Sequence, residues 1–291
     1  MATAFVPSAL PGYALAAVGW GVVRRRAGGR LRRVVTGALV VSLVGVGLHA
    51  GLLAPSYVGS HASGEPDLTV MSANLRFGRG DTDEIVRLAE REDAEVVVLQ
   101  EVTPEALDRL AALRRDRPYT AGRAFQGARG TVVLSAYPLE QVSQLKIYQG
   151  TWVMHVDGPE PFWLIAVHTA QPAGWPDVWR SDHRSLAWNT TLTKRKGGPL
   201  VMAGDFNATL DHGPMRTLLG LGLADAARQA NAGWQPTWPS GPHHGRSVPY
   251  RLGGVAIDHV LVSKDFSTIS TSTHHVDGSD HRALIARLAL R

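Results

Sequence analysis

The feature that most constrains this chain is a series of short apolar runs, each followed within two residues by a polar side chain. Three of these runs lead into Glu101, His168 and Asp205. Runs of this kind are typical of buried strands, and loops at strand ends are where a rigid scaffold presents catalytic groups. The chain is therefore expected to build a sheet protein whose functional groups stand at strand ends.

Helix signals alternate with the apolar runs. Strands are predicted at 68–72, 95–99, 131–135, 162–167, 200–203, 257–262 and 283–288. Helices are predicted after Asp81, which heads a sequence like a capping box, after Thr103-Pro104, and from residue 176 to about 196. The connections 135–153 and 258–280 carry too little helix signal for a purely parallel sheet. The pattern predicts an α/β protein with mixed or antiparallel sheets.

The first 60 residues add a second constraint, because they contain no Asp, Glu or Lys and carry six arginines between residues 24 and 33. The uncharged stretch 34–54 matches the roughly 20 residues that a bilayer-crossing helix needs, and a second uncharged stretch covers 2–23. We predict a membrane anchor over 1–54, made of one transmembrane helix or a helical hairpin. Residues 55–66, rich in Ser and Gly, are expected to form a linker.

The arginines set the expected orientation of this anchor. Basic residues beside a membrane helix favour the cytoplasmic side, which places residues 55–291 outside the cytoplasm with either one span or two. A cleaved signal peptide is the alternative, with a cleavage site near Leu48-His49-Ala50. Because the apolar stretch is long for a signal peptide and the arginines begin late, we favour an uncleaved anchor in the cell membrane.

Charge is distributed unevenly as well. Of 30 basic residues six are the clustered arginines, and the remaining 24 face 25 acidic residues, so the body has a net charge of −1. Neutralisation of phosphates by basic residues supplies most non-specific affinity for nucleic acid, so a nucleic-acid partner is possible but not favoured. The chain has no cysteine, which excludes disulfides, thiolate catalysis and cysteine metal sites.

Two further motifs supply paired polar residues. Asp205 and Asn207 are two positions apart after an apolar run, so both can approach one centre if the chain bends between them. Asp258 starts a predicted strand, where a buried carboxylate is costly unless it is paired. His281 offers that partner, since an Asp–His hydrogen bond fixes the imidazole tautomer and raises its proton affinity. His259 points to the opposite strand face and fits a structural role.

Each of these residues also has an ordinary explanation when taken alone. Glu101 can cap the next helix, Asn74 can form a turn, and a single His168 can be structural. As a group the side chains form an oxygen-rich set with few imidazoles, which suits Mg²⁺ or Mn²⁺ better than zinc. The sequence contains neither a P-loop nor a Gly-x-Ser-x-Gly motif, which argues against nucleotide-loop chemistry and serine hydrolysis.

These motifs resemble those of the endonuclease/exonuclease/phosphatase superfamily, which includes DNase I-like nucleases, abasic-site endonucleases, sphingomyelinases and inositol-phosphate phosphatases. The matching pieces occur in the family's order: Ser72-Ala-Asn74, Leu99-Gln-Glu101, residues 130–138, Val167-His168-Thr169, residues 204–208, Thr237-Trp-Pro239, Ile257-Asp258-His259 and Ser279-Asp280-His281. The resemblance implies a catalytic domain over 67–291, folded as a four-layer α/β sandwich with two central mixed β-sheets.

The resemblance also implies roles for individual residues. Glu101 is the expected principal ligand of Mg²⁺ or Mn²⁺, with Asn74 and Asp280 beside the metal. Asp205 would orient or deprotonate the attacking water, and Asn207 would hold the phosphate. The remaining three residues, His168 and the paired Asp258 and His281, would contact the phosphoryl oxygens and stabilise negative charge in the transition state.

A short anchor followed directly by this domain is similar to membrane-anchored bacterial members, some of them associated with glycopeptide resistance and envelope lipid phosphates. The expected function is hydrolysis of a cell-envelope lipid phosphate or pyrophosphate outside the membrane. One departure is that the acidic partner beside the histidine of DNase I-type nucleases cannot be located for His168. The basic insertions with which abasic-site enzymes clamp DNA are also not obvious.

Two other functions stay open. An extracytoplasmic nuclease or nucleotide phosphodiesterase would use the loop 237–253, whose His243, His244, Arg246 and Arg251 can bind phosphate. A non-catalytic binding module is the second alternative, although such proteins usually lose a site residue and every expected position is occupied here.

Overall fold

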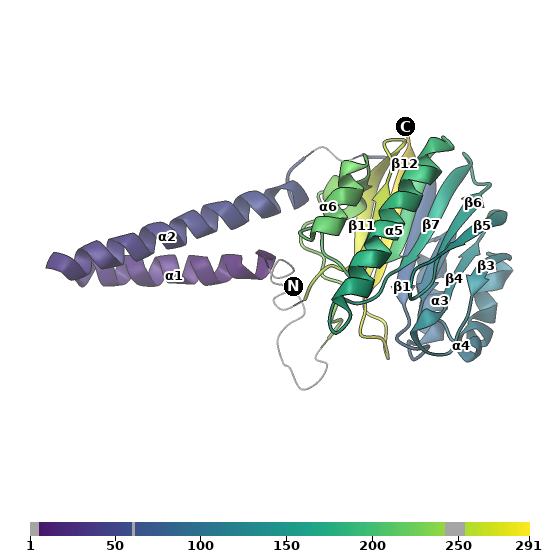
Figure 1. Ribbon diagram of the computed structural model, residues 1–291, viewed down its shortest axis with the longest axis horizontal. Helices are drawn as coiled ribbons and strands as arrows, with labels where there is room; N and C mark the ends of the chain where they lie inside the picture. Colours follow the sequence, from purple (N-terminus) through teal and green to yellow (C-terminus); the bar gives the residue numbers. More distant parts are fainter. Residues whose placement is uncertain (1–5, 60–61, 242–253) are drawn as a thin grey trace.

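The computed structural model describes residues 6–59, 62–241 and 254–291 and contains two β-sheets of six strands each (Figure 1). In the first sheet the strand order is β11-β12-β1-β2-β4-β3. The bounds are β11 Phe266–His274, β12 Ala283–Leu290, β1 Leu68–Asn74, β2 Val96–Gln100, β4 Thr131–Ser135 and β3 Tyr119–Arg123. Only β1 and β2 are parallel among these neighbours, so the sheet is mixed.

The second sheet repeats this arrangement with the order β5-β6-β7-β8-β10-β9. Its strands are β5 Leu139–Leu145, β6 Thr151–Val156, β7 Phe162–His168, β8 Leu200–Asp205, β10 Asp258–Val262 and β9 Ala224–Asp225. The strands β7 and β8 are parallel, and the other neighbours are antiparallel. Each sheet therefore has one central parallel pair, and the carboxyl ends of that pair lie at the same sheet edge.

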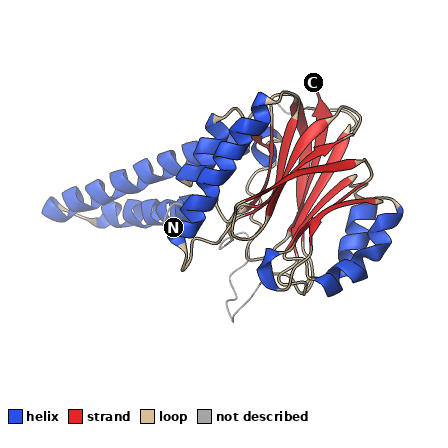
Figure 2. Cartoon of the chain, turned by 45° about the vertical axis from the view of Figure 1, so that its right-hand side comes forward, coloured by secondary structure: helices blue, strands red, loops and turns tan. Residues whose placement is uncertain are grey.

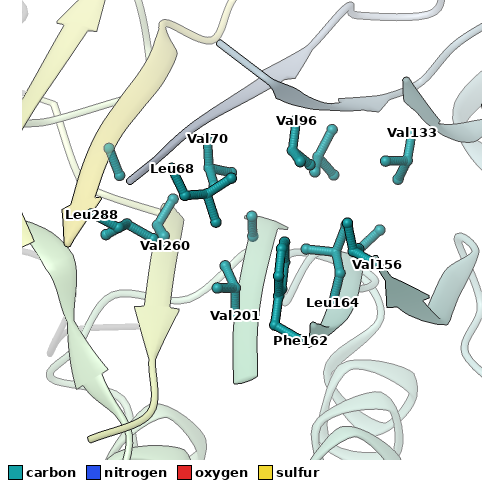
Figure 3. Close-up of a cluster of buried hydrophobic side chains, with 14 of the residues drawn as sticks. Leu68, Val70, Val96, Val133, Val156, Phe162, Leu164, Val201, Val260 and Leu288 are labelled. Atoms are coloured by element: carbon teal, nitrogen blue, oxygen red, sulfur yellow. The ribbon is translucent and has the colours of Figure 1, made fainter. Parts of the chain in front are cut away.

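The two sheets pack face to face, with helices on both outer sides (Figure 2). Figure 3 shows apolar side chains of the first sheet, such as Val70 and Leu288, opposite Val201 and Phe162 of the second. The helices α3 (Thr82–Arg91) and α4 (Pro104–Arg109) cover the first sheet, and α5 (Pro176–Arg195) and α6 (Gly213–Gly220) cover the second. This confirms the predicted four-layer α/β sandwich with two central mixed sheets.

The predicted helix starts are also confirmed. The Asp81 carboxylate accepts hydrogen bonds from the N–H groups of Asp83 and Glu84, and the Thr103 hydroxyl accepts one from Ala106 N–H. The capping box is incomplete, because Glu84 instead accepts a bond from Asp277 N–H. Short helical segments complete the body: η3 Leu110–Arg115, η4 Gly127–Arg129 and α7 Ala226–Gln229.

The N-terminal segment forms a helical hairpin that projects from the sandwich (Figure 1). It consists of α1 (Val6–Arg26) and α2 (Gly29–Leu53), followed by the short η2 (Ala54–Ser56). Among the described residues, the stretch 29–56 is the one helix long and apolar enough to cross a membrane. Two side-chain contacts connect α1 and α2. Arg24 Nε donates a hydrogen bond to Thr36 Oγ1 at 2.9 Å, and the Tyr13 ring stacks on His49. All six arginines lie in the helices next to the turn, so both helices extend further toward it than the predicted spans 2–23 and 34–54.

Candidate active site

The central parallel strands of both sheets deliver the predicted residues to one place. Asn74 ends β1 and Glu101 follows β2, while His168 and Asp205 end β7 and β8 and are register partners. Asp258 starts β10 opposite Asp205. A pocket of about 390 Å³ is lined by six of the eight predicted residues: Glu101, His168, Asp205, Asn207, Asp280 and His281. The other two, Asn74 and Asp258, hydrogen-bond to members of this lining.

Asn74 links Glu101 of the first sheet to Asp205 of the second. Its side-chain amide donates to Glu101 Oε1 at 3.2 Å and to Asp205 Oδ2 at 3.1 Å, and its oxygen accepts from Arg76 N–H at 2.9 Å. The second oxygen of Glu101 accepts from Phe77 N–H at 2.8 Å. Asn74 thus orients two carboxylates that would otherwise repel each other.

Backbone strain is concentrated at this point of the fold. Arg76, Phe77, Glu101 and Asn207 all have positive φ angles, between 46° and 56°. Non-glycine residues adopt this region rarely, and such strain is often found at functional sites. Here it turns the Glu101 carboxylate and the Asn207 amide toward the pocket.

Asp258 and His281 form the predicted pair. His281 Nδ1 lies 2.9 Å from Asp258 Oδ2, and His281 Nε2 lies 3.8 Å from Asp205 Oδ2. Burial works against a charge on His281, but the charges of Asp258 and Asp205 outweigh it and raise the pKa of the imidazole to about 10. At neutral pH the ring is therefore an imidazolium with a proton on each nitrogen, and its Nδ1–H donates to Asp258.

His168 has the opposite character. Burial, reinforced by the positive charge on His281, lowers the pKa of His168 to about 3. Its Nε2 lies 3.9 Å from Glu101 Oε1 and 3.8 Å from Asp205 Oδ2, and no described residue bonds its buried Nδ1. Among the described residues no acidic side chain bonds Nδ1, and at neutral pH His168 is a neutral imidazole.

The site carries an excess of buried negative charge. Burial raises the pKa of Glu101, and burial together with Asp258 raises the pKa of Asp205 to about 7. Among the described residues, no partner reaches Asp258 Oδ1. A divalent cation held by oxygen ligands relieves this kind of strain, so the donor set fits Mg²⁺ or Mn²⁺.

Three buried groups, Asp205, Asp258 and His281, lie close enough together to hold a cation. We place the cation nearer Glu101, because a protonated His281 bonded to Asp258 has no free lone pair for a metal. The assignment of Asn74, Glu101 and Asp280 to the metal stays a prediction. The Asn74 side chain offers its N–H groups to Glu101, and its oxygen faces Arg76 N–H.

Asp280 stands at the pocket mouth between two residues that the sequence did not assign to the site. Arg76 Nε lies 3.7 Å from Asp280 Oδ1, and Trp238 Nε1 donates to Asp280 Oδ2 at 3.3 Å. Trp238 belongs to the family-like motif, but its spacing alone does not reveal this bond. The predicted phosphate-binding histidines and arginines of the neighbouring loop, at 243–251, lie outside the described residues.

A second set of residues fixes the turn 205–209 from behind, and of these the sequence indicated a structural role only for His259. Three successive backbone carbonyls of this turn accept hydrogen bonds from side chains. Phe206 O accepts from Thr169 Oγ1 and His183 Nε2, Asn207 O accepts from Trp179 Nε1, and Ala208 O accepts from His259 Nε2. His259 Nδ1 in turn lies 3.0 Å from Asp225 Oδ2. The expected structural role of His259 agrees with this position, which locks the backbone that carries Asp205 and Asn207.

The indole of Trp179 provides a test of this support. Trp179→Phe removes the 3.0 Å bond to Asn207 O while keeping an aromatic ring on α5. Since one such bond contributes about 0.5–1.5 kcal/mol, we expect kcat on a phosphoester substrate to fall by about three- to tenfold, with KM little changed. Trp188→Phe on the same helix, where the indole is 60% exposed, is the control. Equal kcat values for both variants would contradict a positioning role.

Comparisons with known proteins agree with this geometry. A family model described as the Endonuclease/Exonuclease/phosphatase family matches residues 71–281. No curated protein matches the sequence.

Solved structures share the fold at low sequence identity. An endonuclease/exonuclease/phosphatase from Beutenbergia cavernae is 20% identical, with 78% of this chain and 72% of that chain covered and a TM-score of 0.61. Truncated TDP2 from Caenorhabditis elegans is 14% identical, with 77% and 98% covered and a TM-score of 0.63. The mannosyl-6-phosphatase Bt3783 from Bacteroides thetaiotaomicron is 17% identical, with 77% and 100% covered and a TM-score of 0.56.

The family model covers well over half of the chain, and the residues that carry the resemblance converge on one pocket. The chain belongs to the endonuclease/exonuclease/phosphatase family and is a phosphoester hydrolase.

Proposed function

We propose that this protein is a membrane-tethered, divalent-metal-dependent hydrolase that acts outside the cytoplasm on a cell-envelope lipid phosphate or pyrophosphate. The observation that carries the proposal is the combination, on one chain, of a pocket lined by the family's motif residues and a helix that is long and apolar enough to cross a membrane. A tethered pocket meets membrane substrates at a high effective concentration.

The residues divide the reaction between them. Asp205, buried beside the pocket, orients the attacking water and accepts its proton. The imidazolium of His281, held by Asp258, donates to a phosphoryl oxygen as negative charge develops there. Asn207 and neutral His168 supply further contacts to the phosphate. A cation bound at Glu101 would neutralise charge on the phosphoryl and leaving oxygens.

Several features of the hairpin and of the adjoining loop favour a membrane anchor with the proposed orientation. Side chains such as Leu15 and Val34 are 74% and 69% exposed, as lipid-facing residues are. The arginines gather at the hairpin turn, far in sequence from the catalytic domain, and basic residues favour the cytoplasmic side. Tyr57 and Trp234 lie at the opposite end, where aromatic side chains favour the membrane–water interface.

The two ionised groups of the mechanism predict a bell-shaped pH profile. Activity should fall on the acid side as Asp205 takes up a proton, at or below its pKa of about 7, since a bound cation lowers that value. It should fall on the alkaline side as His281 loses its proton, at or below its pKa of about 10, since the bound cation also disfavours the imidazolium. Asp258→Asn removes one of the charges that raise this pKa, so the alkaline limb of kcat/KM should move to lower pH. A limb that stays in place would show that His281 is not the titrating group.

Removal of the metal gives the direct test of the enzyme class. The full-length protein in detergent micelles is expected to lose essentially all hydrolysis in EDTA and to regain it with excess Mg²⁺ or Mn²⁺. The substrates to compare are polyprenyl pyrophosphate, a phospholipid such as sphingomyelin, an inositol phosphate and DNA. Hydrolysis that persists in EDTA contradicts the metal-dependent reading.

A nuclease is the second candidate. Two arginines offer contacts for a phosphate backbone. Arg76 lines the pocket, and Arg129 lies nearby over the Tyr148 ring. The net charge of the body does not favour a polyanion, so we expect DNA to be a poor substrate.

A further inference from the structure

The segment that follows α2 is hydrogen-bonded to a loop of the catalytic domain. The Ser56 carbonyl accepts from Gly233 N–H at 2.7 Å, and the Tyr57 hydroxyl accepts from Trp234 N–H at 3.0 Å. The Asn231 side chain donates to the Gly59 carbonyl at 2.9 Å. We refer to this contact between residues 56–59 and 231–234 as the juxtamembrane clasp.

The loop side of the clasp has a backbone shaped for close approach. Gly233 has a φ of 75°, and a Cβ atom there would lie 2.7 Å from a ring carbon of Tyr57. Asn231 also has a positive φ, of 52°. Glycine is the residue that tolerates both the left-handed conformation and the contact with the ring, so the Tyr57 ring packs directly on the loop backbone.

The same loop continues into the catalytic site. Thr237 lies three positions after Trp234, and its Oγ1 accepts from the N–H groups of Ile257 and Asp258, both at 3.1 Å. Trp238, the next residue, donates to Asp280. Gln235, between the two ends, donates to the Thr271 carbonyl at 2.9 Å and so holds the loop against β11.

The end of the anchor also lies close to the back of the site. A cavity of about 60 Å³ is lined by Leu52, Leu53 and Ser56 on one side and by Asp258 and His259 on the other. A displacement of residues 56–59 would be transmitted to the site through this short, hydrogen-bonded loop. An error of about 1 Å in the placement of catalytic groups can lower the rate on the order of a hundredfold.

We propose that the juxtamembrane clasp makes the end of the membrane anchor a positioning element of the active site. Tyr57 and Gly233 are then positioning residues, which fix the loop 234–238 and, through Thr237 and Trp238, the placement of Asp258 and Asp280. The tether would thus set the geometry of the catalytic groups as well as the location of the domain. The inference rests on the proposed function for the membrane anchor and for the reaction used to measure it.

The test uses the full-length chain in detergent micelles with three single variants. Tyr57→Phe removes the hydroxyl and keeps the ring, Gly233→Ala forces ring and loop apart, and Val58→Ala changes a neighbouring side chain that is 74% exposed. The readouts are kcat and KM on p-nitrophenyl phosphate and its bis ester, Mn²⁺ affinity by electron paramagnetic resonance, and the melting temperature.

We expect kcat to fall by about tenfold in Gly233→Ala and about threefold in Tyr57→Phe, with KM within about twofold of wild type, because catalytic geometry and not substrate contact is lost. Mn²⁺ affinity should fall in the same order, since Asp280 loses its support. Both substitutions disrupt the same contact, the one between residues 57 and 233. The kcat of the double variant should therefore be no lower than that of Gly233→Ala. Val58→Ala should match wild type.

A folded Gly233→Ala protein with wild-type kcat and Mn²⁺ affinity overturns the proposal, since a merely structural contact would change the melting temperature alone. If Gly233→Ala does not fold, Tyr57→Phe decides on the same readouts. A wild-type protein that hydrolyses neither ester counts against the proposed function, and the Mn²⁺ affinities then decide the clasp: a loss in the clasp variants supports it, and equal values overturn it.

Discussion

His281→Gln is expected to lower kcat by about a thousandfold, the upper range for loss of one preorganised donor to a developing oxyanion. The wild-type ring is buried, its Nδ1 lies 2.9 Å from Asp258 Oδ2, and its pKa is raised to about 10. Glutamine can fill part of the space but carries no positive charge. The measurement is steady-state kinetics at neutral pH with saturating Mg²⁺.

Two comparisons make this result specific. His275→Gln changes a half-exposed histidine and should leave kcat near wild type. Mn²⁺ affinity should also survive in His281→Gln, because the imidazolium is a donor and not a ligand. A loss of kcat below about tenfold would contradict the assigned role. A parallel loss of Mn²⁺ affinity would instead indicate a metal centre at Asp205, Asp258 and His281.

Glu101→Gln is the second variant with a large expected effect. The substitution keeps one of the two oxygens that accept from Asn74 and from Phe77 N–H, replaces the other with an NH2 group, and removes the charge that a hard cation requires. We expect Mn²⁺ affinity to fall by about a hundredfold, within the range seen when metal-site residues are altered. Hydrolysis at subsaturating metal should fall at least as far.

The matched control for this variant is Glu105→Gln, a fully exposed glutamate four positions along the chain. Isothermal titration with Mn²⁺ measures both proteins without reference to a substrate. If Glu101→Gln binds Mn²⁺ as tightly as Glu105→Gln, then Glu101 is not the principal ligand. Activity that survives at saturating metal would show only that the weakened site can still be filled.

Half of the predicted site could be brought together from the sequence because Asn74, Glu101, His168 and Asp205 end or directly follow strands that are buried on both faces. Strands such as β2 and β8 lie between the opposite sheet and an outer helix layer, so they are apolar almost throughout and their polar ends are conspicuous. Once β1 pairs with β2 and β7 with β8 in parallel, their carboxyl ends must meet. The sequence therefore carried enough information to bring Asn74, Glu101, His168 and Asp205 together.

Two of the strands that were not predicted, β5 and β11, have different surroundings. β5 is an edge strand whose middle residues are exposed, and β11 consists largely of Ser and Thr with side chains only partly buried. Neither shows a long apolar run, so their strand character depends on pairing with β6 and β12. Tertiary pairing of this kind overrides weak local preference.

The supporting residues of the site could not be predicted for a related reason. Trp179, His183 and His259 act by donating to backbone carbonyls of the turn 205–209, between 23 and 51 positions away in sequence. A hydrogen bond to a backbone group leaves no trace in the partner's side chain. Arg76 and Trp238 are likewise recognisable only after the fold brings both to Asp280.

The central claim is that the protein is a tethered phosphoesterase for envelope lipids. It is tested most directly by comparing the hydrolysis of several substrates by one preparation of the protein. The full-length protein in micelles is incubated with Mg²⁺ and either polyprenyl pyrophosphate, sphingomyelin or duplex DNA, and product release is compared with that of His281→Gln. We expect hydrolysis of at least one lipid, lost in EDTA and in the variant, and little cleavage of DNA. Efficient degradation of DNA with neither lipid hydrolysed would contradict the account.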